Sequence, residues 1–181
     1  MVSIEADLIE LVCADTLCIA TKTDPAGAIA SLHPYAKVLN TPSQTGCGSI
    51  VGSSPSEFLE GSVSSTAHLF TTRLISRTIG SNNQIVDEIY LRFRHSQPVE
   101  WMLPGIPATG HEVEIVVVRI ACIEAGQVMS ERVYWDQASV LAQVGLLEAK
   151  ATVSETIKKK GVERLPVVGA DAARAVVDWD V

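Results

Sequence analysis

Four long stretches of alternating apolar residues, at 69–79, 85–96, 113–123 and 127–136, constrain the fold of this chain most. Alternation with a period of two places successive side chains on opposite faces, which is typical of strands with one buried face. Ser81-Asn82-Asn83 separates the first two stretches, and Ala125-Gly126 forms a tight two-residue turn between the last two. The second half of the chain is therefore predicted to be an antiparallel sheet.

Helical spacing of apolar residues marks the regions around this sheet. Residues 3–21, 24–33 and 56–67 are predicted helices before the long strands, and 138–147 and 170–177 are helical segments after them. A short strand is predicted at 35–39, and a loop rich in Gly, Ser, Thr and Pro at 41–55. The pattern indicates an α+β fold, in which about three N-terminal helices cover one face of a strongly curved antiparallel sheet and a helical tail follows.

Acidic residues outnumber basic ones, which limits the partners of the chain. With 21 Asp and Glu against 14 Lys and Arg, the net charge of the 181 residues is −7, so we expect no binding to nucleic acid or to an anionic membrane. The longest apolar run, 113–123, contains Arg119 and is too short to span a bilayer. The first residues lack the basic start of a secretory signal, so a cytoplasmic protein is expected. The spacing of the four cysteines and four histidines predicts no metal site.

The stretch 85–96 carries two ionisable residues on its apolar face. Alternation places Asp87 and His95 on the same face as Ile85, Ile89, Leu91 and Phe93. A buried carboxylate or imidazole needs a partner or a shifted pKa, and this is the environment of catalytic acids and bases. The simpler interpretation is that Asp87 caps the preceding turn and that His95 lies in solvent at the strand end.

Glu131 is the strongest candidate for a proton carrier. Pairing across the Ala125-Gly126 turn places Ile123 opposite Val128 and, further back, Ile120 opposite Glu131. Glu131 is then the one charge on an apolar face, where a carboxylate has a raised pKa or binds a cation, and either state suits proton transfer. The alternative is an ion pair between Glu131 and an arginine of a neighbouring strand, which would stabilise the sheet.

The reverse face of the same strand pair is predicted to carry Arg119 directly opposite Arg132, with Tyr134 and Asp136 further along. Two adjacent arginines need a carboxylate such as Glu88, or a partner subunit. We interpret this face as an interface.

Two more segments offer side chains to a cavity on the concave face of the sheet. Glu100-Trp101 precede a loop with two prolines and two glycines, so an indole and a carboxylate are expected near the mouth of the cavity. His33-Pro34-Tyr35 offers an imidazole and a phenol to the same cavity. In both cases simple packing on the core is the alternative.

Two motifs give the chain a family resemblance. Residues 101–110, Trp-Met-Leu-Pro-Gly-Ile-Pro-Ala-Thr-Gly, and the run 131–147 that begins Glu-Arg-Val-Tyr-Trp-Asp resemble SnoaL-like polyketide cyclases of the fungal natural-product type. The likeness extends to 165–170 and more loosely to 86–88. The chain has Ser130-Glu131-Arg132 where such relatives have His-Glu-His.

The resemblance implies the nuclear-transport-factor-two-like (NTF2-like) fold, a cone of curved antiparallel sheet closed by helices and dimeric through the sheet. It implies one domain over residues 1–181, with 148–181 as a C-terminal extension. It also implies an isomerase or cyclase that moves protons on a hydrophobic polyketide, terpenoid or alkaloid intermediate without a cofactor. The alternatives are a non-catalytic ligand-binding or accessory dimer of the same fold, and a dehydratase.

The predicted site combines residues from several of these segments. We expect Glu131 to be the principal acid/base and Asp87 or His95 to be the second proton carrier, because the reaction needs two proton carriers around one shaped, dry site. The residues expected to bind the small hydrophobic substrate are Tyr35, His33, Trp101, Trp135, Phe93 and Met129.

Overall fold

The fold is seen in a computed structural model that describes residues 32–49, 51–62, 69–148, 159, 161 and 165–179. The helix predicted over 3–21 and almost all of the one predicted over 24–33 lie outside the described residues. Positions 32 and 33 begin a strand instead, so the second predicted helix does not reach His33. Among the described residues, no helix is long and apolar enough to cross a membrane.

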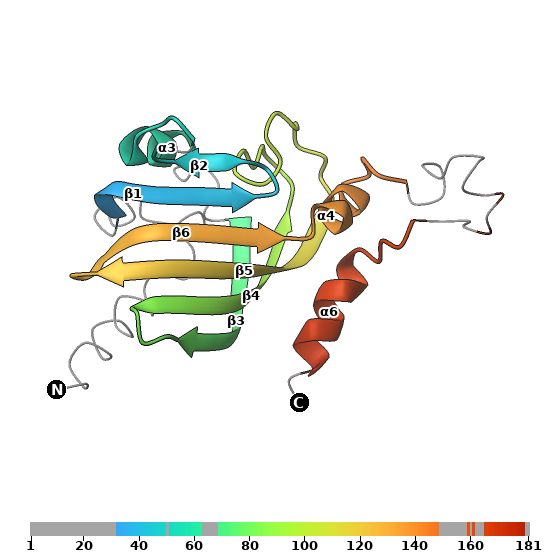
Figure 1. Ribbon diagram of the computed structural model, residues 1–181. Coiled ribbons are helices and arrows are strands. Elements are labelled where there is room, and N and C mark those ends of the chain that lie inside the picture. The colour runs from blue at the N-terminus through green and yellow to red at the C-terminus, as the bar shows by residue number, and fades with distance from the viewer. Residues whose placement is uncertain are drawn as a thin grey trace.

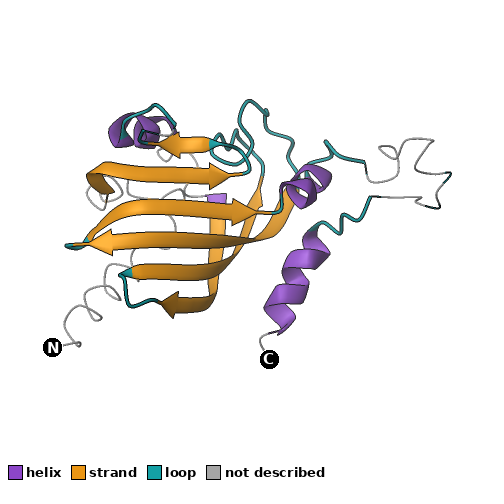
Figure 2. Cartoon of the chain, in the orientation of Figure 1, coloured by secondary structure: helices purple, strands orange, loops and turns teal. Residues whose placement is uncertain are grey.

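Six strands form one curved, open sheet in the order β2-β1-β6-β5-β4-β3 (Figures 1 and 2). The strands are β1 (Leu32–Thr41), β2 (Thr45–Cys47), β3 (Phe70–Ile79), β4 (Gln84–Arg94), β5 (Glu112–Glu124) and β6 (Gln127–Trp135). The four long strands confirm the alternating pattern, and each pairs antiparallel with its neighbour along the chain. At the β5–β6 turn, Ala125 and Gly126 both have positive φ, as a tight two-residue hairpin requires.

The N-terminal part of the sheet differs from the prediction. β1 is ten residues long and pairs parallel with β6, while the region predicted as a loop contains the short strand β2, antiparallel to β1. The sheet is therefore mixed and not purely antiparallel. Gly46 makes the β1–β2 pairing close, because a Cβ on Gly46 would collide with the carbonyl of Val38.

Three helices are described: α3 (Pro55–Ser62), α4 (Gln137–Gln143) and α6 (Ala170–Trp179). Asp136 caps α4, because its side chain accepts hydrogen bonds from the amide and hydroxyl of Ser139. α3 packs near β1 and β2, whereas α4 and α6 lie together beside β5 (Figure 1). The predicted helical segments at 56–67, 138–147 and 170–177 thus exist with shifted ends, the first of them as far as it is described.

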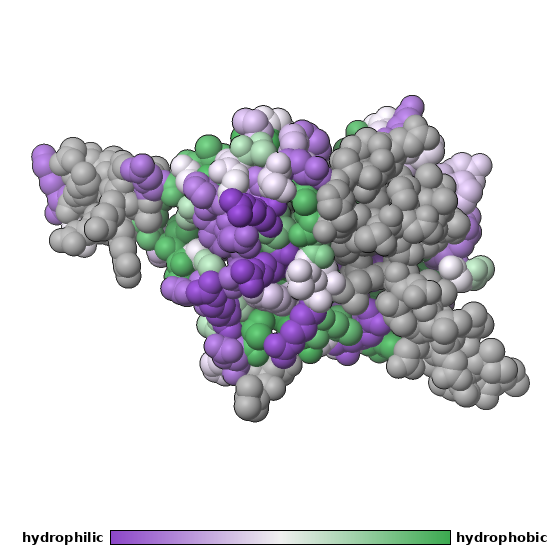
Figure 3. All heavy atoms as spheres, turned by 180° about the vertical axis from the view of Figure 1, so that it is seen from behind, coloured by the Kyte–Doolittle hydropathy of each residue, from purple (hydrophilic) through white to green (hydrophobic). Residues whose placement is uncertain are grey.

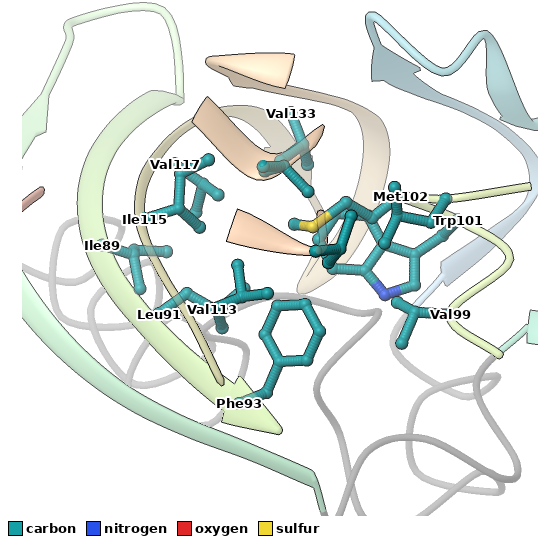
Figure 4. Close-up of a cluster of buried hydrophobic side chains, with 13 residues drawn as sticks. Ile89, Leu91, Phe93, Val99, Trp101, Met102, Val113, Ile115, Val117 and Val133 are labelled. Atoms are coloured by element: carbon teal, nitrogen blue, oxygen red, sulfur yellow. The ribbon is translucent and has the colours of Figure 1, made fainter. Parts of the chain in front are cut away.

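Two hydrophobic clusters fill the inner face of the sheet. The larger one joins β4, β5 and β6 to the irregular segment between β4 and β5 and to α4 (Figure 4). In that segment Trp101, Met102 and Leu103 are almost fully buried. The hydroxyls of Ser43 and Thr45 both donate to the carbonyl of Trp101, at 2.7 and 2.8 Å. The β1–β2 turn therefore fixes the backbone that carries this indole.

The register between β5 and β6 corrects the predicted faces. Ile123 pairs with Val128 as expected, but a β-bulge follows, and Glu131 lies opposite Ala121 instead of Ile120. Met129 is the extra residue that has no partner on β5. This one extra residue shifts every later β5–β6 pair by one position from the predicted register. The β5 residues predicted on the outer face therefore lie on the inner face, and those predicted on the inner face lie on the outer face.

The helix α6 is attached to the outer face of the sheet by a charged contact. The Arg174 guanidinium donates to both carboxylate oxygens of Glu114, at 2.8 and 2.7 Å, and the Tyr90 hydroxyl donates to the same carboxylate. Pairing with Arg174 lowers the pKa of Glu114 to about 2.

This contact makes the docking of α6 dependent on pH. Because the pKa of Glu114 is below its ordinary value of 4.5 in the folded chain, the ion pair stabilises α6 at higher pH and is lost as the pH falls toward 2. Hydrogen exchange of the α6 amides, corrected for the intrinsic rate, should therefore show weaker protection at pH 3 than at pH 7. An Arg174→Gln variant should have weak protection at both pH values; equal protection in the wild type at both would contradict this.

Candidate functional site

Four alternating charges form a connected row inside the sheet: Arg77 on β3, Asp87 on β4, Arg119 on β5 and Glu131 on β6. We name it the buried charge row. Arg77 donates twice to Asp87, from Nε at 2.6 Å and from Nη2 at 3.0 Å. Arg119 donates from Nη1 to Asp87 at 3.2 Å and from Nε to Glu131 at 2.7 Å. Arg119 therefore joins the two carboxylates.

The strand register places these side chains next to one another. Arg77, Asp87 and Arg119 are direct cross-strand partners on three adjacent strands. Arg119 lies opposite Val133, so Glu131, two residues earlier on β6, is its diagonal neighbour on the same face. The row thus follows from alternation once the bulge at Met129 is taken into account.

Burial makes this row energetically unusual. Asp87 and Arg119 are 0% exposed and Glu131 is 2% exposed, although buried charges are costly unless they are paired and hydrogen-bonded. Two guanidinium groups and two carboxylates balance in charge, and arginine keeps its proton under all ordinary conditions. The two acids consequently face fixed cations and accept hydrogen bonds from them. Seen from behind, the described surface carries a band of hydrophilic residues (Figure 3). Asp87, Arg119 and Glu131 are not part of this band, because they are buried.

The sequence predicted the burial of the two acids correctly but assigned Arg119 wrongly. Asp87 and Glu131 both lie on the apolar inner face, and the simpler interpretation of Asp87 as a solvated turn cap does not hold. Arg119 does not lie opposite Arg132 on the outer face; it lies inside, while Arg132 is exposed. The alternative in which Glu131 pairs with an arginine of a neighbouring strand is the arrangement that the structure shows.

A thiol lies next to this row. Val38 pairs with both Cys47 and Glu131, so the three residues form a line across β2, β1 and β6. Burial, and to a smaller degree the charge of Glu131, raises the pKa of Cys47. The thiol therefore stays protonated at neutral pH and is not an activated nucleophile.

Aromatic rings form a second feature on the inner face. Ring centroids are 6.5 Å apart for His95 and Phe93, 5.0 Å for Phe93 and Phe70, and 6.0 Å for Phe70 and Trp101. We name these four residues the aromatic row. Trp135 packs edge-on against Trp101 with centroids 5.4 Å apart. The predicted substrate-binding residues Phe93, Trp101 and Trp135 are thus brought together.

His95 is fully buried at one end of the aromatic row. The backbone amide of Thr109 donates to its Nδ1 at 3.3 Å, and the Thr109 hydroxyl lies 3.0 Å from the same atom. Burial, with a smaller contribution from His111, lowers the pKa of His95. The ring is therefore neutral at physiological pH, and because Nδ1 accepts a hydrogen bond, its proton is on Nε2.

The structure separates His95 from the charged residues. Asp87 and His95 are eight residues apart on one extended segment, which is roughly 26 Å along the chain at about 3.3 Å per residue. Asp87 and Glu131, in contrast, bind the same guanidinium. Of the two predicted partners for Glu131, Asp87 is the one that lies in the same cluster.

Three other predicted substrate-binding residues lie elsewhere. Tyr35 is 83% exposed and cannot line an enclosed cavity. Ala36 and Val38 are buried, so alternation along β1 places Tyr35 on the opposite face, together with the exposed Lys37. His33 is half-buried beside it, with its Nδ1 accepting from the Tyr35 amide. Met129 is half-buried at the bulge and does not join the aromatic row.

The residues that sequence reasoning missed are Arg119, Arg77 and Phe70. A signal for Arg119 did exist, because a lone arginine in the apolar run 113–123 must find an acid if that run is buried. Within the described ranges, no group of three or more His, Cys, Asp or Glu side chains has the arrangement of a metal site.

Comparison with solved structures identifies which known fold this chain has. No family model and no curated protein matches the sequence, but many solved structures match the fold. TsrD from Streptomyces laurentii is 19% identical, with a TM-score of 0.58 over 78% of this chain and 97% of that protein. A protein from Jannaschia sp. CCS1 assigned to the SnoaL-like polyketide cyclases is 14% identical, with a TM-score of 0.60 over 82% of this chain and 98% of its own.

The epoxide hydrolase/cyclase-like enzyme SalBIII, which takes part in pyran ring formation in salinomycin, also matches. It is 12% identical, with a TM-score of 0.52 over 73% of this chain and 93% of its own. The chain has the NTF2-like fold. The resemblance to SnoaL-like proteins is therefore confirmed at the level of the fold, and the open, mixed six-stranded sheet is the NTF2-like α+β architecture.

Proposed function

We propose that this protein is a cofactor-independent isomerase or cyclase that acts by acid/base catalysis on a hydrophobic polyketide, terpenoid or alkaloid intermediate. One observation carries the proposal: the carboxylate of Glu131 and the guanidinium of Arg119 are buried together in the apolar face of an NTF2-like sheet. Proteins of this fold include one assigned as a polyketide cyclase and one epoxide hydrolase/cyclase-like enzyme.

The proposed chemistry uses Glu131 as the base. Its carboxylate takes a proton from a carbon next to a substrate carbonyl, the C–H bond breaks, and the electron pair moves to the carbonyl oxygen. A preorganised guanidinium stabilises such an oxyanion strongly when water is excluded, and Arg119 is the nearest cation to Glu131 in the row. In an isomerase whose substrate has a C=C bond conjugated with the enolate, the proton on Glu131 returns to the far carbon of that dienolate. In a cyclase, the enolate carbon attacks a second carbonyl, a C–C bond forms, and the resulting alkoxide takes the proton from Glu131.

Asp87 is the second proton carrier in this proposal, because it shares Arg119 with Glu131. Phe93, Trp101 and Trp135 form the apolar wall that holds the substrate. The outer face of the sheet beyond α6, with half-buried Val118 and Ile120, is the surface through which we propose that two copies pair.

Deuterium exchange tests the proton transfer without knowledge of the natural substrate. We expect the protein to accelerate exchange of the acidic C–H groups of 2-tetralone in D2O by about 10²-fold or more, the range of a positioned general base. Proton NMR follows the exchange, and heat-denatured protein at the same concentration is the control. Exchange at the buffer rate, with intact folded protein, would argue against a proton-transfer enzyme for ketones of this kind.

A non-catalytic ligand-binding protein is the second candidate. It is favoured by the ion pairs themselves, since Arg77 and Arg119 already satisfy the buried acids as a purely structural network would. Saturable binding of 2-tetralone without any acceleration of exchange would support this candidate over the enzyme.

A further inference from the structure

Two ring N–H groups at the aromatic row are buried without a hydrogen-bond partner. They are Nε1 of Trp101 and Nε2 of His95, and neither has an acceptor within the part of the chain that the structure describes. Trp101 is 1% exposed and His95 is 0% exposed, so bulk water does not reach them. An indole N–H can only donate, and the His95 ring carries its proton on Nε2 because Thr109 donates to Nδ1. Both groups are therefore donors.

The neighbouring Trp135 shows that a buried indole N–H in this aromatic environment can have a hydrogen-bond partner. The indole of Trp135, packed against Trp101, donates from Nε1 to Oε1 of Gln137 at 2.6 Å. Buried indole N–H groups ordinarily find such a partner. Leaving a buried donor unpaired costs the full desolvation penalty of that group, so two in one aromatic cluster indicate that an acceptor from outside the chain belongs there.

The positions of the two donors indicate the shape of that acceptor. His95 and Trp101 flank Phe93 and Phe70 in the aromatic row, with neighbouring centroids 5.0 to 6.5 Å apart. In the close-up, the indole nitrogen of Trp101 lies on the side of the ring that faces Val99 and Phe93 (Figure 4). The donors thus border an apolar aromatic wall.

We propose that the Trp101 indole N–H and the His95 Nε2–H are two hydrogen-bond donors that hold separate oxygen atoms of a flat, neutral, oxygenated ring system lying against Phe70 and Phe93. Ketone or ring-ether oxygens supply acceptors without a charge that would have to be desolvated. This inference deepens the proposed function, on which it rests for the identity of the inner face as the substrate site. The ring system is then one end of a longer substrate: His95 and Trp101 hold that end, and the proton chemistry takes place at the other end, at the buried charge row.

Chromone is a suitable probe, because it is flat and carries a ketone oxygen and a ring oxygen at opposite ends of one ring. Naphthalene is the matched hydrocarbon of the same size. The chain has three tryptophans, so a nitrogen–proton correlation NMR spectrum contains three indole signals, which Trp101→Phe and Trp135→Phe variants assign. Chromone should move the Trp101 signal downfield, as a new hydrogen bond does, while naphthalene should not. No Trp101 shift with chromone at millimolar concentration, or an equal shift with naphthalene, would overturn the proposal.

Binding measurements on variants give a second readout. Trp101→Phe should weaken chromone binding about three- to tenfold, the worth of one neutral hydrogen bond. His95→Asn should do the same, because Asn can still accept from the Thr109 amide but lacks Nε2–H. Trp135→Phe is the matched control, since it removes an indole whose N–H already has a partner, and it should leave chromone affinity within twofold. Equal losses in all three variants would show a packing effect and overturn the assignment.

The outcomes separate this inference from the proposed function. If chromone shifts the Trp101 signal but no ketone undergoes exchange in D2O, the two-donor binding site is supported and the proposed proton-transfer activity is contradicted. If exchange is fast but chromone leaves the Trp101 and His95 signals unchanged, the proposed proton-transfer activity is supported and the two-donor binding site is contradicted.

Discussion

Replacing Arg119 with methionine should lower the free energy of unfolding by about 3–5 kcal/mol, the cost of breaking a buried ion pair by removing one partner. In this R119M variant Asp87 still binds Arg77, but Glu131 loses the guanidinium that it binds in the wild type. The carboxylate would then be buried without that cation. At about 2–4 °C per kcal/mol for a chain of this length, the melting temperature should fall by roughly 6–20 °C. Urea unfolding and thermal unfolding both measure the loss.

A double variant tests whether the lower stability of R119M comes from the buried Glu131 carboxylate that has lost its cation. R119M combined with Glu131→Leu removes one cation and one anion together, and Arg77 and Asp87 remain as a balanced pair. We expect most of the lost stability to return, because apolar residues can replace a buried ion pair at little cost. Arg132→Met is the surface control on the same sheet and should change stability by no more than about 0.5 kcal/mol. A double variant as unstable as R119M would show that packing of Arg119, and not its charge, stabilises the fold.

The strands could be predicted because their signal is local. In 85–96 and 113–136 the alternation of apolar residues records directly which side of each strand faces the core, and the Ala125-Gly126 turn fixes the first cross-strand pair. That pair, Ile123 with Val128, is correct. The parallel pairing of β1 with β6 joins segments about 90 residues apart, and nothing in either segment indicates the other.

The site could be predicted only in part, and a single residue explains most of the failure. Val128 and Met129 are both apolar, so the sequence gives no sign that Met129 bulges out of the ladder. Without that bulge, Arg119 falls on the outer face and Glu131 has no cation within the sheet. With it, Arg119 bonds both acids. The burial of each acid was predictable because it depends only on alternation, whereas their shared partner depends on the register.

The aromatic row depends on tertiary packing in the same way. Phe70, Phe93 and Trp101 come from β3, β4 and the irregular segment after β4. The turn residues of that segment identify it as a connection but do not say that it folds back into the core. Ser43 and Thr45 hold it there through the Trp101 carbonyl, and no pattern in the sequence links those hydroxyls to residue 101.

Replacing Glu131 with glutamine should reduce turnover of a ketone substrate by about 10²- to 10⁴-fold, the contribution of a positioned general base. The amide oxygen of glutamine can still accept the hydrogen bond from Arg119 Nε, but an amide cannot take up the substrate proton. Arg119 also keeps its contact with Asp87, so the site should retain its geometry. Deuterium exchange of 2-tetralone in D2O measures the loss.

Glu88→Gln is the matched control for this change, because it makes the same chemical replacement on the opposite face of the sheet. Glu88 follows Asp87 on β4 and accepts a hydrogen bond from the Ser76 hydroxyl at 2.6 Å. If the reaction occurs on the inner face, E88Q should exchange 2-tetralone at the wild-type rate while E131Q does not. Full activity in E131Q would remove Glu131 as the base. Equal losses in both variants would point to a general effect on the sheet, because two carboxylates on opposite faces cannot both touch one substrate.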